Sequence, residues 1–146
     1  MNNAQRKQIA GIQKDLEAPM LWLASLRGAL ENSDDSDSVL TDEHTAQLED
    51  AVNKLEDAAA RIEELREEEE DKFDNMPESL QSSEKGEALE AAKDALTEAF
   101  DTLDMLVSDL GNDISSDTTC AEASEILETA EETLDEVCCC LDNAVA

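Results

Sequence analysis

The sequence predicts an all-α protein, and three observations support this. Helix breakers are rare, with 4 Gly and 2 Pro in 146 residues. Large apolar side chains recur every seven residues in four segments, and three polar linkers, NSDDSDS, NMPESLQSS and GNDISS, separate these segments. A single domain over 1–146 follows, either an antiparallel four-helix bundle or long helical hairpins with coiled-coil-like packing that complete their core as a homodimer. An acidic disordered chain, the remaining alternative, would not keep this register.

The first two segments carry paired apolar rows. Segment 3–31 has Ile9, Leu16, Leu23 and Leu30 in one row and Ile12, Pro19 and Leu26 in the next. Pro19 is expected to kink or split this helix. Segment 42–75 begins after a plausible N-cap, Thr41. Its rows are Leu48, Leu55 and Ile62, then Ala51, Ala58 and Leu65, where the apolar stripe stops.

The last two segments follow the same rule. Segment 84–110 lies between Ser83 and Gly111, which suit an N-cap and a C-terminal stop. Segment 118–145 opens with the capping-box pattern from Thr119 to Glu122. The rows are Leu89, Leu96, Leu103 and Leu110 with Ala92, Ala99 and Leu106, then Cys120, Leu127, Leu134 and Leu141 with Ala123, Ala130, Val137 and Ala144.

Net charge is the outstanding property of the chain, at −29. Such acidity repels nucleic acid and anionic membranes and attracts basic surfaces, including those that hold nucleic acid. The charge is uneven: residues 1–31 carry +1, 32–41 carry −3, 42–75 carry −10, 76–110 carry −7 and 111–146 carry −10. A bundle of 28-residue helices, about 42 Å long, would carry about one net charge per 1.5 Å. Duplex DNA carries one per about 1.7 Å.

The run REEEEDKFDNMPE, residues 66–78, places like charges four apart near a helix C-terminus. Each such pair costs a helix roughly 0.2–0.5 kcal/mol, and the macrodipole adds further repulsion. Because the fold gains nothing from this run, we expect a basic partner to relieve the repulsion. Two partner-binding clusters are predicted, comprising Glu63, Glu64, Glu67, Glu68, Glu69, Glu70, Asp71 and Asp74, and then Glu128, Glu131, Glu132, Asp135 and Glu136.

The segment EEEEDKFDNMPESLQSSEKGEALE, together with the opening MNNAQRKQI, resembles a family of small acidic helical proteins encoded by bacteriophages and prophages. Phe73, Asn75, Pro77, Gln81 and Gly86 are among the residues that a generic acidic helix would not supply. The resemblance covers about a third of the chain and implies phage origin, but no catalytic residues. By analogy, small acidic phage proteins include DNA mimics that block restriction enzymes, CRISPR effectors or other host DNA-binding proteins.

The corner after the acidic run also has two interpretations. Phe73, Met76 and Leu80 either close the core between the second and third segments or form a partner-binding hydrophobic tip. Trp22 likewise either fills the bundle near Pro19 or marks a docking face on the least acidic helix.

No catalytic, metal or cofactor motif is evident. His44 is the lone histidine and suits a solvated or capping position. The linker from Asn32 to Glu43 resembles a degenerate calcium loop, but Asp37 stands where Gly is needed, so a solvated linker is the expectation. Cys120 is about 27 Å along the helix from Cys138, so the two cannot share a metal ion within one chain.

The cysteines and the chain opening indicate a compartment. Cys138, Cys139 and Cys140 are adjacent and fit no secreted disulfide framework, so reduced thiols are expected, with Cys139 pointing away from the core. No apolar stretch suits a secretory signal or a membrane span. The sequence therefore predicts a protein of the host bacterial cytoplasm that is not an enzyme.

Two functions remain open. The first is a phage-derived DNA-mimic inhibitor that occupies the basic cleft of a host nucleic-acid-binding protein, an anti-CRISPR, anti-restriction or similar anti-defence role. The second is a helical assembly, adaptor or chaperone-like protein that docks partners through apolar faces, with acids serving only solubility.

Overall fold

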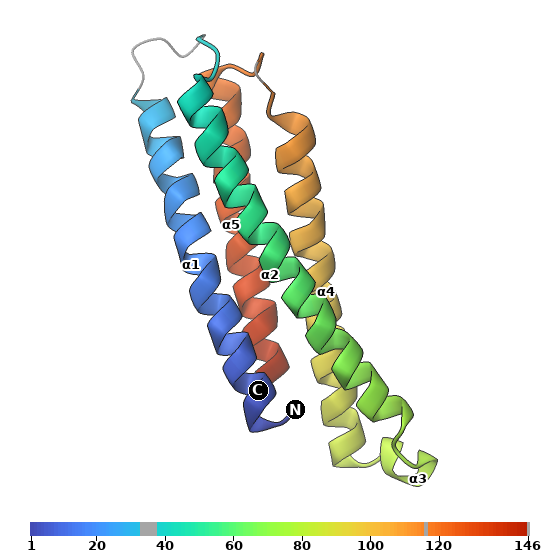
Figure 1. Cartoon of the computed structure of the whole chain (residues 1–146). Helices are drawn as coiled ribbons and strands as arrows, with labels where there is room; N and C mark the ends of the chain where they lie inside the picture. Colours follow the sequence, from blue (N-terminus) through green and yellow to red (C-terminus); the bar gives the residue numbers. More distant parts are fainter. Residues whose placement is uncertain (33–37, 116, 146) are drawn as a thin grey trace.

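The computed structural model describes residues 1–32, 38–115 and 117–145, and over these ranges the protein is all-α (Figure 1). Its long helices are α1 (Asn3–Glu31), α2 (Asp42–Asp74), α4 (Glu84–Asp113) and α5 (Cys120–Val145). These confirm the four predicted segments to within a few residues. Two details were wrong. Gly111 does not stop the third long helix, which continues to Asp113, and the second linker contains a short helix, α3 (Glu78–Gln81).

The four long helices form a closed ring. α1 packs against α2 and α5, and α4 packs against the same two helices, so α1 lies diagonally across from α4, and α2 from α5. Successive helices run in opposite directions (Figure 1). The fold is therefore an antiparallel four-helix bundle whose core is closed within one chain, and a second copy is not needed to complete it.

The predicted apolar rows form the core. Every member of the paired rows is buried, from Ile9 in α1 to Ala144 in α5. Pro19 is also buried, inside an uninterrupted α1, so it does not split the helix. Seven-residue spacing predicts burial here because antiparallel helices that cross at a shallow angle keep the same stripe in contact along their length.

The predicted caps are present as well. The backbone N–H of His44 donates to Thr41 Oγ1 at 3.2 Å, and His44 Nδ1 accepts from the Thr41 N–H at 3.4 Å, which gives the histidine a capping role. Thr119 and Glu122 exchange the same pair of bonds at 3.1 and 3.3 Å. Ser83 caps α4.

Two linkers meet at the upper end of the bundle. Val39 and Thr119 form an antiparallel β-bridge, with the Cys120 N–H donating to the Ser38 carbonyl at 2.8 Å. This contact ties the entry to α2 to the entry to α5. Residues 33–37 of the calcium-like linker from Asn32 to Glu43 lie outside the described residues.

At the lower end, α2 and α4 reach past α1 and α5, and α3 joins them at the tip (Figure 1). The side-chain amide of Gln81 donates to the backbone carbonyls of Phe73 and Met76, which closes the end of α2. Gly86 must be glycine, because a Cβ there would overlap the Gln81 carbonyl. Phe73 and Met76 are only half-buried and Leu80 is 50% exposed, so this corner closes the core incompletely.

Candidate acidic interaction surfaces

Most of the predicted partner-binding acids face solvent. Glu63 and Glu131 are half-buried, and each is ion-paired: Glu63 Oε1 lies 3.7 Å from Arg66 Nη2 and Glu131 Oε2 lies 2.6 Å from Arg27 Nε. The exposed members are Glu64, Glu67, Glu68, Glu70, Asp71, Asp74, Glu128, Glu132, Asp135 and Glu136. These ten remain available to a partner.

Glu69 is the exception, and its predicted surface role is wrong. Its side chain is fully buried, with Oε1 2.8 Å from Lys72 Nζ and Oε2 3.6 Å from the Met1 amino group. Gln5, also buried, accepts from Lys72 and donates to Glu68 Oε2 at 2.8 Å. Glu69 is therefore part of a polar layer inside the bundle, between α1 and α2.

The sequence carried a signal for this layer. Glu69 lies seven residues after Ile62, Lys72 lies seven after Leu65, and Gln5 lies seven before Ile12. All three therefore continue core rows in polar form. The apolar stripe ends at Leu65, but the register that buries it continues to Glu69, and a carboxylate at such a position needs a partner.

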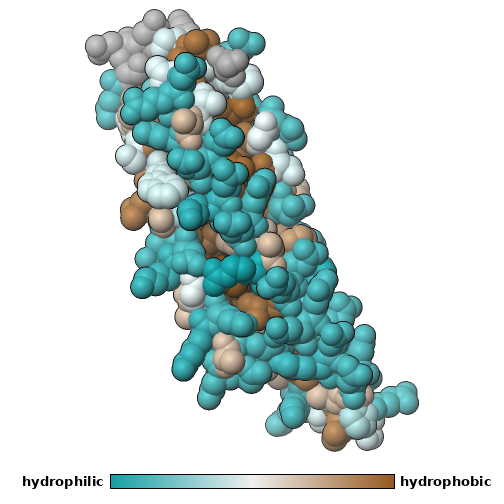
Figure 2. Space-filling model, in the orientation of Figure 1, coloured by the Kyte–Doolittle hydropathy of each residue, from teal (hydrophilic) through white to brown (hydrophobic). Residues whose placement is uncertain are grey.

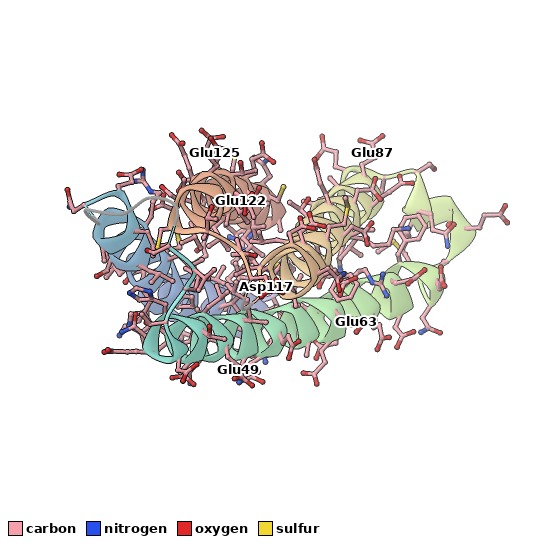
Figure 3. All side chains as sticks on the ribbon, turned by 90° about the horizontal axis from the view of Figure 1, so that it is seen from above. Glu49, Glu63, Glu87, Asp117, Glu122 and Glu125 are labelled. Carbon is pink, nitrogen blue, oxygen red and sulfur yellow. The ribbon has the colours of Figure 1, made fainter. Side chains whose placement is uncertain are left out.

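The two predicted clusters do not form one surface. The first lies on α2 and the second on α5, and these helices are diagonal in the bundle. Figure 3 shows the consequence for neighbouring acids, because Glu125 and Glu87 project from one side of the molecule and Glu49 from the opposite side. Any single partner surface must therefore use one cluster, together with acids on an adjoining helix.

Lysine and arginine residues are unevenly distributed between the N-terminal and C-terminal parts of the chain. Residues 1–74 contain eight Lys or Arg, while residues 94–146 contain fifteen acids and no Lys, Arg or His. Several bases have partners near α2: Arg61 contacts Asp15, and Arg66 lies over the Phe100 ring, 5.6 Å from its centroid. Among the described residues, the one ion pair that reaches α5 is Arg27 with Glu131.

A second set of acids, on α4, lies beside α5 and was missed at the sequence level. Asp109 and Asp113 line a groove between α4 and α5, and Glu98 lies against Cys140. Their spacing gave little warning, because periodicity identifies the exposed side of a helix but not which neighbour lies next to it. We define the α4/α5 face by its exposed acids, Glu98, Asp101, Asp109, Asp113, Glu122, Glu125, Glu128, Glu132, Asp135 and Glu136.

The α4/α5 face has a linear charge density close to that of a nucleic-acid strand. Its ten carboxylates lie along a helix pair about as long as the 26-residue α5, roughly 39 Å at about 1.5 Å per residue. That is about one charge per 4 Å, compared with one phosphate per about 3.4 Å along one DNA strand. The α2 side is similarly hydrophilic, with teal residues covering most of the face in Figure 2.

The burial of the four cysteines and the exposure of Trp22 decide between the alternatives that the sequence left open for these residues. Cys120 and Cys140 are buried and Cys139 is exposed, and all four cysteines are free. Burial raises the pKa of the Cys138 thiol, and the carboxylates of Asp135, Asp142 and Glu17 raise it further. Trp22 is 42% exposed, so it does not fill the bundle.

The described ranges contain neither a cluster of metal ligands nor a membrane-spanning helix. No group of three His, Cys, Asp or Glu residues there could hold a metal ion. No helix in the same ranges is long and apolar enough to cross a membrane.

Fold and surface together define the class: an acidic four-helix bundle with a base-free face. Comparison with family models, curated proteins and solved structures found no match.

Proposed function

We propose that this protein is an inhibitor that occupies the basic nucleic-acid-binding cleft of another protein by imitating nucleic-acid charge. The α4/α5 face carries the proposal, because it presents ten exposed carboxylates with no Lys, Arg or His between residues 94 and 146. The resemblance to acidic phage proteins supports a target in a host defence system.

The mechanism is competition for lysine and arginine side chains. A cleft that holds phosphate would meet carboxylates at a similar linear spacing, and counterions released from both surfaces favour association. The buried rows beneath α4 and α5 hold these carboxylates on a packed scaffold, which lowers the ordering cost of binding. Salt should weaken the complex steeply.

The test uses the full chain as bait in a bacterial lysate. Captured proteins are eluted either by a salt step or by short duplex DNA, and the purified captures are then assayed for nucleic-acid binding with and without the chain. The proposal expects DNA to elute the same proteins as salt and the chain to displace DNA from them. Captured proteins that do not bind nucleic acid, or that DNA cannot elute, would contradict it.

The adaptor alternative has its own support in the exposed apolar residues of α1. Leu21 is 69% exposed and Trp22 42% exposed, on the helix with the lowest acidity. Trp22→Ala discriminates between the two functions. It should leave capture unchanged if the acids bind the partner, and abolish capture if α1 is the docking element.

A further inference from the structure

A groove between α4 and α5 carries an inference beyond charge alone. Its volume is about 430 Å³, and its floor includes Leu106, Leu110 and the small Ala130. Met105, which is 66% exposed, and the half-buried Ile126 stand on either wall. A lone exposed methionine would need no explanation, but here it borders an apolar hollow within the base-free α4/α5 face.

Two threonines extend the apolar lining. Thr129 and Thr133 both line the groove, and their hydroxyls donate to carbonyls one turn earlier in α5, at 3.3 and 2.9 Å. Because each hydroxyl already has an acceptor in its own helix, it has little need of a partner in the groove. The α5 wall therefore favours contact with apolar groups.

Carboxylates border this lining on both helices. On α4, Asp109 and Asp113 line the groove itself, and Glu98 lies one turn before Thr102. On α5, Glu122 and Glu136 are exposed, one turn before Ile126 and one turn after Thr133 respectively. The groove is thus an apolar strip between two acidic borders, with no base in the sequence from residue 94 onward.

We propose that this groove seats a basic amphipathic helix of the partner. Such a helix would place leucine- or methionine-sized side chains between Met105 and Ile126 and lysines or arginines against the acids on both borders. The inference rests on the proposed function, because it names the element of the basic partner that the α4/α5 face recognises. Charge complementarity selects a basic occupant, and the apolar strip selects one with an apolar stripe.

The dimensions suit about three helical turns. Groove-lining residues on α4 run from Thr102 to Asp113, which span roughly 17 Å of helix at about 1.5 Å per residue. A helix laid along two antiparallel helices packs its ridges into the channel between them. A β-strand would have no edge to pair with, since both walls are α-helical and their backbone groups are bonded within each helix.

The first experiment compares two synthetic peptides of about five helical turns (~18 residues) made of leucine and lysine. One carries its leucines at i, i+3, i+4 and i+7, and the other has the same composition in an order that gives no apolar face. We expect the full chain to bind the amphipathic peptide at least about tenfold more tightly, a difference of about 1.4 kcal/mol. Equal affinities would overturn the groove proposal while leaving the charge-mimic function intact.

Matched variants locate the contact. Met105→Gln keeps the size of the side chain but removes its apolar character. It should lower the affinity for the amphipathic peptide by about five- to tenfold and leave the affinity for the peptide without an apolar face unchanged. Leu21→Gln changes a side chain of similar exposure, 69% against 66%, on α1. It should change the affinity less than about twofold. Equal losses in the two variants would contradict the proposal.

Methyl spectroscopy gives a direct readout. The chain contains four methionines, so selective ¹³C labelling yields four methyl signals. Adding the amphipathic peptide should shift the Met105 signal and leave those of Met20, on α1, and Met76, before α3, in place. A shift at Met76 or Met20 without one at Met105 would place the peptide elsewhere and overturn the assignment. If neither the peptides nor any nucleic-acid-binding protein associates with the chain, the proposed function fails too.

Discussion

The first helix pair, α1 and α2, and the last, α4 and α5, share one packing pattern but treat charge differently. Both bury paired rows seven residues apart. The first pair mixes acids with eight bases, several of which contact acids or aromatic rings. The last pair has two bases, Lys85 and Lys93, both in the first third of α4, and residues 94–146 have fifteen acids and no base. Solubility alone would be served by either arrangement. Sorting the charge in this way instead leaves one face able to attract a basic partner.

The largest expected effect comes from neutralising the base-free face. Glu125→Gln, Glu128→Gln, Glu132→Gln and Asp135→Asn together should weaken partner capture by about a hundredfold, because four charged contacts at roughly 0.5–1 kcal/mol each are lost. The measurement is the retention of captured protein on the immobilised chain at fixed salt. Circular dichroism should show unchanged helix content, since all four side chains are exposed.

A matched variant on α2 tests whether location matters. Glu49→Gln, Glu56→Gln, Glu67→Gln and Asp71→Asn remove the same number of charges from exposed positions on the other side of the bundle. Retention should change less than about threefold, through long-range screening only. Equal losses from the two variants would mean that net charge, and not the α4/α5 face, attracts the partner.

The acidic run on α2 gives the next largest effect, on stability. Glu69→Gln should lower the free energy of unfolding by about 2 kcal/mol, because it leaves Lys72 without its buried counter-charge in the polar layer with Gln5. Glu70→Gln, one position along and exposed, should instead raise it by a few tenths, because it removes like-charge repulsion along the helix. Urea denaturation of both variants checks the pair, and the same sign for both would contradict the buried layer.

Helix geometry explains which features of the fold could be predicted from the sequence and which could not. Seven-residue rows placed the core correctly, and local patterns such as Thr41 to His44 placed the caps, because both depend on residues within a turn or two. Glu69 has a side chain typical of the surface, so the sequence predicted it there, although its spacing of seven residues from Ile62 is that of a core position. The α4/α5 face could not be predicted, since the choice of which helices adjoin in the ring depends on the whole chain.

A smaller effect concerns Arg27, the one base among the described residues that forms an ion pair with α5. Arg27 Nε lies 2.6 Å from Glu131 Oε2, and both side chains are partly exposed, at 30% and 20%. Solvent screening limits such a pair, so Arg27→Gln should lower the free energy of unfolding by about 0.5 kcal/mol. The same change removes the base that contacts Glu131 of α5 and should raise partner retention slightly. Thermal melting in low and high salt measures the first effect, which should shrink as salt rises.

The smallest expected effect is on the reactivity of the thiols in α5, which depends on the negative potential of nearby carboxylates. Burial raises the pKa of the Cys140 thiol above its usual 9.0, and Glu98 and Glu136 raise it further. The exposed Cys139 should therefore react first with a maleimide near pH 8, with Cys138 and Cys140 following slowly. Because these folded-state pKa values are raised, the neutral thiols stabilise the fold below about pH 9, and that contribution is lost as the pH rises through the folded pKa.

Glu98→Gln isolates the contribution of charge to this thiol. It should speed Cys140 labelling by about two- to threefold at fixed pH, because one nearby carboxylate no longer opposes the thiolate. Glu17→Gln is the matched control, since Glu17 raises the pKa of Cys138 and should speed labelling there. Glu-directed cleavage releases the three adjacent thiols on one peptide, residues 137–146, and tandem fragmentation of that peptide assigns the label to each cysteine. If Glu98→Gln leaves the labelling rate of Cys140 unchanged and Glu17→Gln leaves that of Cys138 unchanged, burial alone raises the two pKa values. The two carboxylates are then too well solvated to affect the neighbouring thiols.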